Sequence, residues 1–304
     1  MSVEPPREPL FEPAFVRALE ALTLAARRVP SGRAAGQWRS RASGSSVEFS
    51  DYRTYAPGDE FRRIDWNAYA RLERLFVRLY RAEEDLALGI MVDVSASMAW
   101  GKPTSKGRLA AQVAGALAFI ALQSGDRAEV ATCQGGAIGE RLARLRGEAA
   151  AWAAWRMLER LDFASGGSTD LDAALGSWAR YLRAPGLAVV ISDLFSPPGY
   201  QQGIDALLGA RQDVLLLHVL APDELDPPAD ILGEWRLLDS EPLAPVEATI
   251  TPGVLRAYRR LVQGFSREAA DFCRRRGVTY LQLRSDLDIK EVVLRTFRRH
   301  GILI

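Results

Sequence analysis

Short apolar runs alternate with amphipathic segments from residue 86 to the end of the chain. Apolar runs of this length are typical of strands buried on both faces of a parallel sheet. They predict strands at residues 86–92, 128–133, 187–192, 214–220 and 278–283, an edge strand at 137–145, and an antiparallel pair at 235–238 and 246–250. Helical spacing predicts helices at residues 106–124, 148–161, 171–182, 200–209, 254–276 and 289–299. The alternation predicts an α/β fold, a doubly wound, mostly parallel sheet with helices on both faces.

The first 85 residues follow a different pattern. Residues 1–10 are acidic and rich in proline, which predicts a disordered tail. Residues 11–28 have helical spacing at Phe15, Leu19 and Leu22, and alternating segments at 47–55 and 75–80 predict strands. We therefore expect residues 11–85 to form an amino-terminal helix and an arginine-rich β arm, followed by the α/β domain at 86–304.

Composition narrows the class of protein. The formal net charge is +1 over 304 residues, which gives no global sign of nucleic-acid binding. The chain has two distant cysteines, Cys133 and Cys273, which is typical of a reducing compartment. Neither a signal peptide nor an apolar run long enough to span a bilayer is present in the sequence. We expect a cytoplasmic protein that does not contact a membrane.

The first strand of the α/β domain ends in a group of oxygen-bearing side chains. Asp93, Ser95 and Ser97 follow the apolar run at alternate positions. Ligands gather beyond the carboxyl ends of the strands in doubly wound sheets, and alternate residues tend to point the same way. Carboxylate and hydroxyl oxygens suit a hard cation such as Mg²⁺. The alternative is a strand-ending acid followed by a serine-rich turn that caps the next helix.

Two further loops of the same kind lie where this edge of the sheet should be. One contains Thr169 in the glycine-rich segment SGGSTD, and the other begins with Asp193 directly after a strand. Together with Asp93, Ser95 and Ser97 they supply five candidate ligands from three loops. Three neighbours are candidates for a supporting role around these ligands: Ser168, Asp170 and Ser192.

This set resembles the metal-ion-dependent adhesion site of von Willebrand factor A domains, in which D-x-S-x-S, a later Thr and a later Asp surround Mg²⁺. The upstream segment resembles a bacterial domain-of-unknown-function family, number fifty-eight. Its matching positions are Glu48-Phe49, Tyr55, Pro57-Gly58-Asp59, Arg62, Ile64-Asp65-Trp66, Ala70-Arg71 and Val77-Arg78. Members of that family are von Willebrand factor A-like proteins commonly encoded beside MoxR-type AAA+ ATPases.

The resemblance implies Mg²⁺-dependent recognition of a protein partner that offers an Asp or Glu to the metal, with Mn²⁺ or Ca²⁺ as alternative ions. It also implies a role as adaptor or co-chaperone of a MoxR-type ATPase. We predict no catalytic residue. His218 lies within the apolar run VLLLHVL and is expected in the core, and GKPTSK at residues 101–106 lacks the spacing of a phosphate-binding loop.

Three alternatives stay open at this point. The first is a metal-dependent hydrolase that uses Asp170 or Asp193 as a general base. The second is nucleic-acid binding through the arm, where residues 27–81 contain twelve arginines against six acids. The third is a structural role without metal. If the arm instead docks a protein, its candidate contacts are Arg53, Arg62, Arg63 and Arg71.

Overall fold

The structure is a computed structural model that describes residues 9–25, 47–56, 64–72, 74–82, 86–237 and 246–304. The chain divides into two compact units, one formed by residues 1–28 with 86–304 and the other by residues 29–85. The larger unit is the predicted α/β domain, and it contains the carboxyl ends of the strands on which the candidate ligands lie.

The larger unit is built on a six-stranded sheet with the order β10-β7-β6-β3-β4-β5. Its strands are β3 (Ala87–Asp93), β4 (Arg127–Gln134), β5 (Ala137–Leu145), β6 (Gly186–Ser192), β7 (Gln212–Leu220) and β10 (Thr279–Arg284). All neighbouring pairs are parallel except β4 and β5, which are antiparallel. The predicted fold class is confirmed, and β5 lies at one edge of the sheet, as expected, with β10 at the other.

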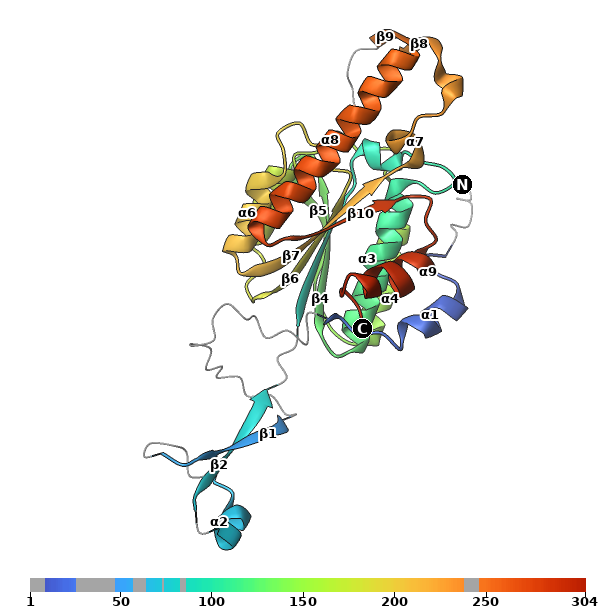
Figure 1. The fold of residues 1–304 in the computed structure, drawn as a ribbon. Coiled ribbons are helices and arrows are strands. Elements are labelled where there is room, and N and C mark those ends of the chain that lie inside the picture. The colour runs from blue at the N-terminus through green and yellow to red at the C-terminus, as the bar shows by residue number, and fades with distance from the viewer. Residues whose placement is uncertain (1–8, 26–46, 57–63, 73, 83–85, 238–245) are drawn as a thin grey trace. The chain divides into compact units, whose positions relative to one another are not determined.

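Helices cover both faces of this sheet (Figure 1). One face carries α1 (Pro13–Leu19), α3 (Lys106–Gln123), α4 (Glu148–Glu159) and the last helix, which begins as α9 (Ile289–Glu291) and continues as a π-helix (Val292–Phe297). The other carries α5 (Leu171–Ala179), α6 (Gln201–Gly209) and α8 (Pro252–Arg276). The described part of the unit also contains a 3₁₀-helix (Ala96–Ala99), α7 (Pro222–Leu225), a 3₁₀-helix (Ala229–Ile231) and the antiparallel pair β8 (Gly233–Leu237) and β9 (Val246–Ile250).

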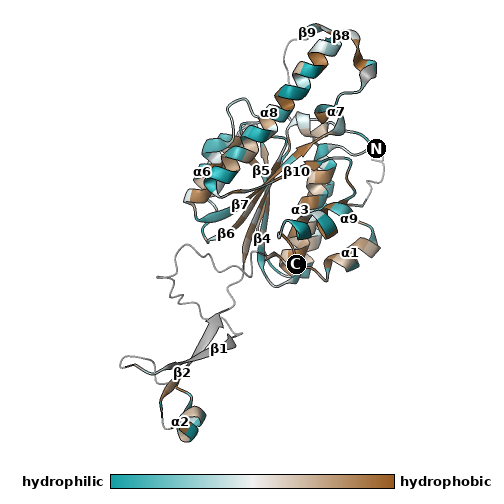
Figure 2. Ribbon diagram, viewed as in Figure 1, coloured by the Kyte–Doolittle hydropathy of each residue, from teal (hydrophilic) through white to brown (hydrophobic). Residues whose placement is uncertain are grey.

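The two cores follow from the alternation of side chains along each strand. On β3, Ile90 and Val92 belong to the core under α3, and Met91 belongs to the core under α5 and α6. Helix α3 is apolar almost all round, as Figure 2 shows, because α1, α4 and the sheet surround it. Burial of this helix fixes the position of its first residue, Lys106, at the carboxyl end of the sheet.

The amino-terminal helix belongs to the α/β unit and not to the arm, which corrects the expected 11–85 grouping. Phe15 and Leu19 are buried against the core under α3, and Leu10 is buried too although it lies in the segment expected to be disordered. The helix ends at Leu19, before the predicted end at residue 28, because the following backbone pairs with the chain's last residues. Leu24 forms an antiparallel bridge with Leu303.

Helical spacing in residues 148–161 predicts Trp152, Trp155 and Leu158 as the core face of α4. Trp155 and Leu158 are buried as predicted, and the Trp155 indole donates to the Gly115 carbonyl at 2.9 Å. Trp152 was expected on the same face but is 44% exposed. Its ring lies edge-on to Trp155 with centroids 4.7 Å apart, so it covers the rim of the core rather than entering it.

The smaller unit pairs β1 (Val47–Thr54) with β2 (Phe76–Ala82) in antiparallel register, with α2 (Trp66–Leu72) between them in sequence. Asp65 caps α2 by accepting hydrogen bonds from the backbone N–H groups of Asn67 and Ala68. The predicted strands are therefore present. Pro57-Gly58, a dipeptide typical of a turn between two strands, lies outside the described residues.

His218 is a buried polar residue of β7, as the sequence predicts. Its Nδ1 lies 2.7 Å from the Tyr280 hydroxyl, and its ring packs against Phe265 of α8. Burial lowers the pKa of the imidazole from 6.5 to about 4. The unfolded chain therefore takes up a proton below pH 6.5, whereas the folded protein does so only near pH 4.

This shift predicts a loss of stability in acid that depends on one residue. The His218 contribution is fully present above pH 6.5 and is lost as the pH falls toward 4, by roughly 2 to 3 kcal/mol. Urea unfolding of wild type and His218→Gln at pH 7.5 and 4.5 measures it. We expect the stability difference between the two proteins to shift against wild type by that amount in acid; a pH-independent difference contradicts the assignment.

Candidate functional site

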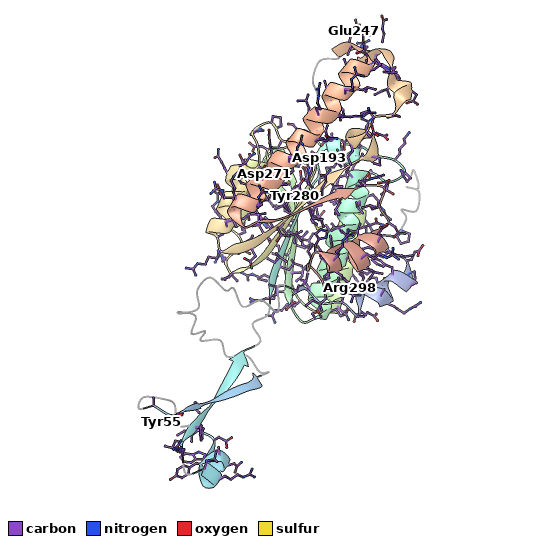
Figure 3. All side chains as sticks on the ribbon, in the orientation of Figure 1. Tyr55, Asp193, Glu247, Asp271, Tyr280 and Arg298 are labelled. Atoms are coloured by element: carbon purple, nitrogen blue, oxygen red, sulfur yellow. The ribbon has the colours of Figure 1, made fainter. Side chains whose placement is uncertain are left out.

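The parallel pairing of β3 with β6 brings two acids to the same edge of the sheet. Val92 lies opposite Ile191 in this register, so Asp93 and Asp193 leave adjacent strands at neighbouring positions. Both side chains are buried, with exposed fractions of 1% and 0%. Figure 3 marks Asp193 at the end of the sheet on which α7 lies. Burial of two carboxylates this close requires compensating donors or cations.

Asp93 is held by neutral donors. Its Oδ1 accepts the backbone N–H of Ser95 at 2.9 Å, and its Oδ2 accepts the Ser192 hydroxyl at 2.6 Å. Burial, and next the negative charge of Asp193, raise the pKa of the Asp93 carboxyl from 3.8 to about 6. The two hydrogen bonds therefore compensate the Asp93 charge only in part. A cation beside this carboxylate would stabilise its ionised form.

The two serines after Asp93 point their hydroxyls toward each other. Ser95 and Ser97 share a hydrogen bond with their Oγ atoms 3.0 Å apart, at the beginning of the 3₁₀-helix Ala96–Ala99. Ser95 is buried and Ser97 is half-buried. The site therefore has a boundary with solvent on the Ser97 side.

The glycine-rich loop lies directly against this turn. The backbone N–H of Ala96 donates to the Gly167 carbonyl at 3.2 Å. A Cβ added to Gly166 would lie 2.1 Å from the Val94 carbonyl oxygen, so only glycine permits this approach. The loop that precedes Thr169 therefore packs against the turn that follows Asp93.

Thr169 has a buried hydroxyl that lacks a partner. The residue is 2% exposed, and its Oγ1 forms no hydrogen bond within the described part of the chain. The Cys133 thiol lies beside it. Burial, and next the charge of Asp93, raise the pKa of that thiol well above its ordinary value. An unpaired buried hydroxyl is costly, which makes Thr169 Oγ1 available to a ligand.

Asp193 differs from Asp93 because a buried ammonium group compensates its negative charge. Its Oδ2 accepts a hydrogen bond from Lys106 Nζ at 2.7 Å, and its Oδ1 accepts the backbone N–H of Phe195 at 3.0 Å. The same ammonium lies 2.5 Å from Glu224 Oε1 on α7. Burial raises the pKa of the Glu224 carboxyl, against the opposing effect of Lys106.

Neither Lys106 nor Glu224 is among the residues that the sequence predicts at the site. One signal was present for Lys106, which is one of three lysines in the chain and directly follows Ser105 at the start of an apolar helix. Ser105 is the N-cap of α3 and accepts the backbone N–H of Arg108. No local pattern relates Glu224 to a lysine 118 residues earlier.

The three residues expected in supporting roles have different positions. Ser192 contacts Asp93 directly. Asp170 caps α5 by accepting the backbone N–H of Ala173 at 2.9 Å, and Ser168 is exposed, with its carbonyl accepting the Gly135 N–H. Only Ser192 therefore bonds to a member of the candidate ligand set.

The donor set is one that a hard cation fits. Two carboxylates and three hydroxyls from three loops are buried or half-buried, and all five supply oxygen. Within the described ranges there is no group of three or more His, Cys, Asp or Glu side chains that could hold a metal. Any cation here would therefore depend on the hydroxyls of Ser95, Ser97 and Thr169.

The arginines expected to bind a partner lie in the other unit. Arg71 is exposed on α2, and Arg53 is part of β1. Arg62 and Arg63 lie outside the described residues. Their role stays a prediction.

The cysteines and the helices bear on the predicted class of protein. Cys133 and Cys273 are both free and buried. Within the ranges that the structure describes, every helix is too short or too polar to cross a membrane.

Comparisons with known proteins give a family. Residues 51–265 match the family described as "Protein of unknown function DUF58". Uncharacterized proteins of Mycobacterium tuberculosis (Rv1480) and Mycobacterium bovis (Mb1516) are each 30% identical over 308 residues, which covers 99% of this chain and 96% of the relative.

Solved structures similar to the chain include an aerotolerance-related membrane protein of Bacteroides fragilis, with 15% identity and a TM-score of 0.43. The match covers 71% of this chain and 98% of that one. BatB of Bacteroides thetaiotaomicron is similar with 14% identity and the same TM-score, over 71% of this chain and 97% of that one.

Adjacent glycines in the loop provide a test of its packing. Gly166→Ala should destabilise the protein by ~2 kcal/mol or more, because the new methyl group meets the Val94 carbonyl. A Cβ at Gly167 has no atom within 4 Å, so Gly167→Ala should change stability by less than about 1 kcal/mol. Chemical denaturation measures both. Equal effects at the two positions contradict the close approach described above.

Proposed function

The chain belongs to the DUF58 family, and we propose that it is a von Willebrand factor A-like module that uses a divalent cation, Mg²⁺ by preference, to recognise a protein partner. Asp93, Ser95, Ser97 and Thr169 would hold the ion, with Asp193 alongside. The bound ion supplies an open coordination position that an Asp or Glu of the partner can fill. Mn²⁺ and Ca²⁺ are alternative occupants.

One observation carries the proposal. Thr169 Oγ1 is buried without a hydrogen-bond partner in the described part of the chain, on a loop packed against the turn that presents Ser95 and Ser97. A buried hydroxyl left unpaired in this way costs about 1 to 3 kcal/mol, unless a ligand uses it. The raised pKa of Asp93 points the same way, because a cation would relieve the repulsion from Asp193.

Charge supports a divalent rather than a monovalent ion. The cluster contains three carboxylates, of the buried Asp93 and Asp193 and the half-buried Glu224, and one ammonium, of Lys106. With all four groups ionised, three negative charges and one positive charge leave a net charge of −2. One divalent cation neutralises this charge.

Recognition fits the site better than hydrolysis does. Asp170 and Asp193 are the acids considered as general bases, and both are engaged. Asp170 caps α5, and Asp193 accepts the Lys106 ammonium. A general base must be free to take a proton from water.

The partner follows from the family resemblance alone. We propose a MoxR-type AAA+ ATPase, which the chain would serve as adaptor or co-chaperone in the cytoplasm. Partner binding and metal binding would then strengthen each other by the same factor, because they are thermodynamically linked. The arginines of the smaller unit are a separate candidate contact for the same partner.

Metal binding can be separated from folding by a substitution at Thr169. Thr169→Val keeps the shape of the side chain and removes no protein hydrogen bond, so without divalent ions it should be as stable as wild type or slightly more stable. Its affinity for Mg²⁺, measured by calorimetry, should fall by about tenfold or more.

Thr279→Val is the matched control, since Thr279 is exposed at the amino end of β10, the opposite end of the sheet from the site. Its Mg²⁺ affinity should equal that of wild type. If Thr169→Val binds Mg²⁺ as tightly as wild type, the proposed site is wrong.

Partner recognition is tested by capture of a purified MoxR-type ATPase from the same genome. Wild type and Asp93→Asn would be immobilised and exposed to the ATPase with Mg²⁺ or with chelator. We expect capture only by wild type with Mg²⁺, reduced by about tenfold or more in the other three conditions. Equal capture in all four conditions rejects metal-dependent recognition of this partner.

A further inference from the structure

A lysine ammonium lies buried at the edge of the candidate metal site. Lys106 is 0% exposed and is the first residue of α3. A cation is disfavoured both by burial and by the positive end of the helix dipole. Its position therefore depends on the two carboxylates that it contacts, Asp193 at 2.7 Å and Glu224 at 2.5 Å.

The two carboxylates belong to different parts of the fold. Asp193 follows β6 and is a candidate metal ligand. Glu224 lies on α7, where its second oxygen accepts the backbone N–H of Ala221 at 2.8 Å. The Lys106 ammonium thus has a partner on the metal side and another partner on the α7 side, both already within contact distance.

We propose that Lys106 is a positioning residue that competes with the divalent cation for Asp193 and shifts onto Glu224 when the cation binds. This inference rests on the proposed metal site. Two cations next to one carboxylate repel each other strongly in a buried environment. Glu224 offers the ammonium a charged partner away from the metal, so the shift needs no new contact to form.

The competition gives opposite predictions for the two residues that contact each other. Lys106→Met removes the competing cation and frees Asp193, so divalent affinity should rise. Glu224→Gln removes the alternative partner and leaves the ammonium on Asp193 alone, so divalent affinity should fall. A merely structural role for this ion pair would lower the affinity in both variants.

The experiment is a Mn²⁺ titration of each purified full-length protein, followed by the electron paramagnetic resonance signal of free Mn²⁺. We expect Lys106→Met to bind on the order of tenfold tighter than wild type and Glu224→Gln on the order of tenfold weaker. Arg160→Gln is the matched control, because it breaks the exposed Arg160–Glu140 pair, which involves none of the contacts of Lys106, Asp193 or Glu224, and should leave the affinity unchanged.

The results separate the proposed metal site from the proposed role of Lys106. A folded wild type that binds no Mn²⁺ rejects the proposed function. A wild type that binds Mn²⁺, with both variants weakened or both unchanged, rejects only the role of Lys106. An unchanged Glu224→Gln rejects the shift onto Glu224 even if Lys106→Met binds more tightly.

Folding of Lys106→Met is itself informative, because the substitution leaves Asp193 without its ammonium. Circular dichroism with and without Mn²⁺ should show a larger gain in thermal stability from the ion than wild type shows. If the variant is unfolded in both conditions, Glu224→Gln alone decides, and an affinity equal to or above that of wild type overturns the proposal.

Discussion

Two carboxylates buried at the ends of neighbouring parallel strands are the constraint on which the site depends. The register of β3 with β6 leaves no freedom to separate Asp93 from Asp193. The negative charge of each carboxylate must be compensated where it lies, and the compensating groups differ between the two. Asp93 receives a backbone N–H and the Ser192 hydroxyl, whereas Asp193 receives an ammonium. The raised pKa of Asp93 indicates that neutral donors are insufficient for two charges in one buried region.

Much of this arrangement could be predicted from local sequence. Apolar runs that end in an acid locate Asp93 and Asp193 at strand ends, and parallel strands bring their carboxyl ends to one edge. The glycines before Thr169 indicate a close backbone approach, which the contact between Gly166 and Val94 explains. The prediction that these strand ends share one edge needs only parallel strand direction, which follows from the alternation of strands and helices. The strand order itself comes from the structure.

Long-range contacts could not be predicted in the same way. Periodicity correctly indicates a helix that contains Phe15, but not that it packs on α3 rather than with the following arm. Lys106 and Glu224 meet only because α7 follows β7 at the same edge of the sheet. Trp152 has core spacing and still lies at the rim, because α4 covers the end of a layer that α1 and α3 already fill. Each of these features depends on which elements are neighbours in space. Side-chain periodicity does not encode that information.

Two routes connect the site to α8, one through the loop after Asp193 and the other through α7. Phe195 lies 5.1 Å from the Lys106 ammonium, measured to the ring centroid, and its ring packs against Phe265 of α8 with centroids 5.7 Å apart. Glu224 lies on α7, and α7 ends at the Asp226–Arg259 pair with α8. A shift of Lys106 from Asp193 toward Glu224 would therefore change one contact on each route. Because packed elements of this kind move between discrete arrangements rather than deforming continuously, α8 is the element best placed to respond to the proposed shift of Lys106.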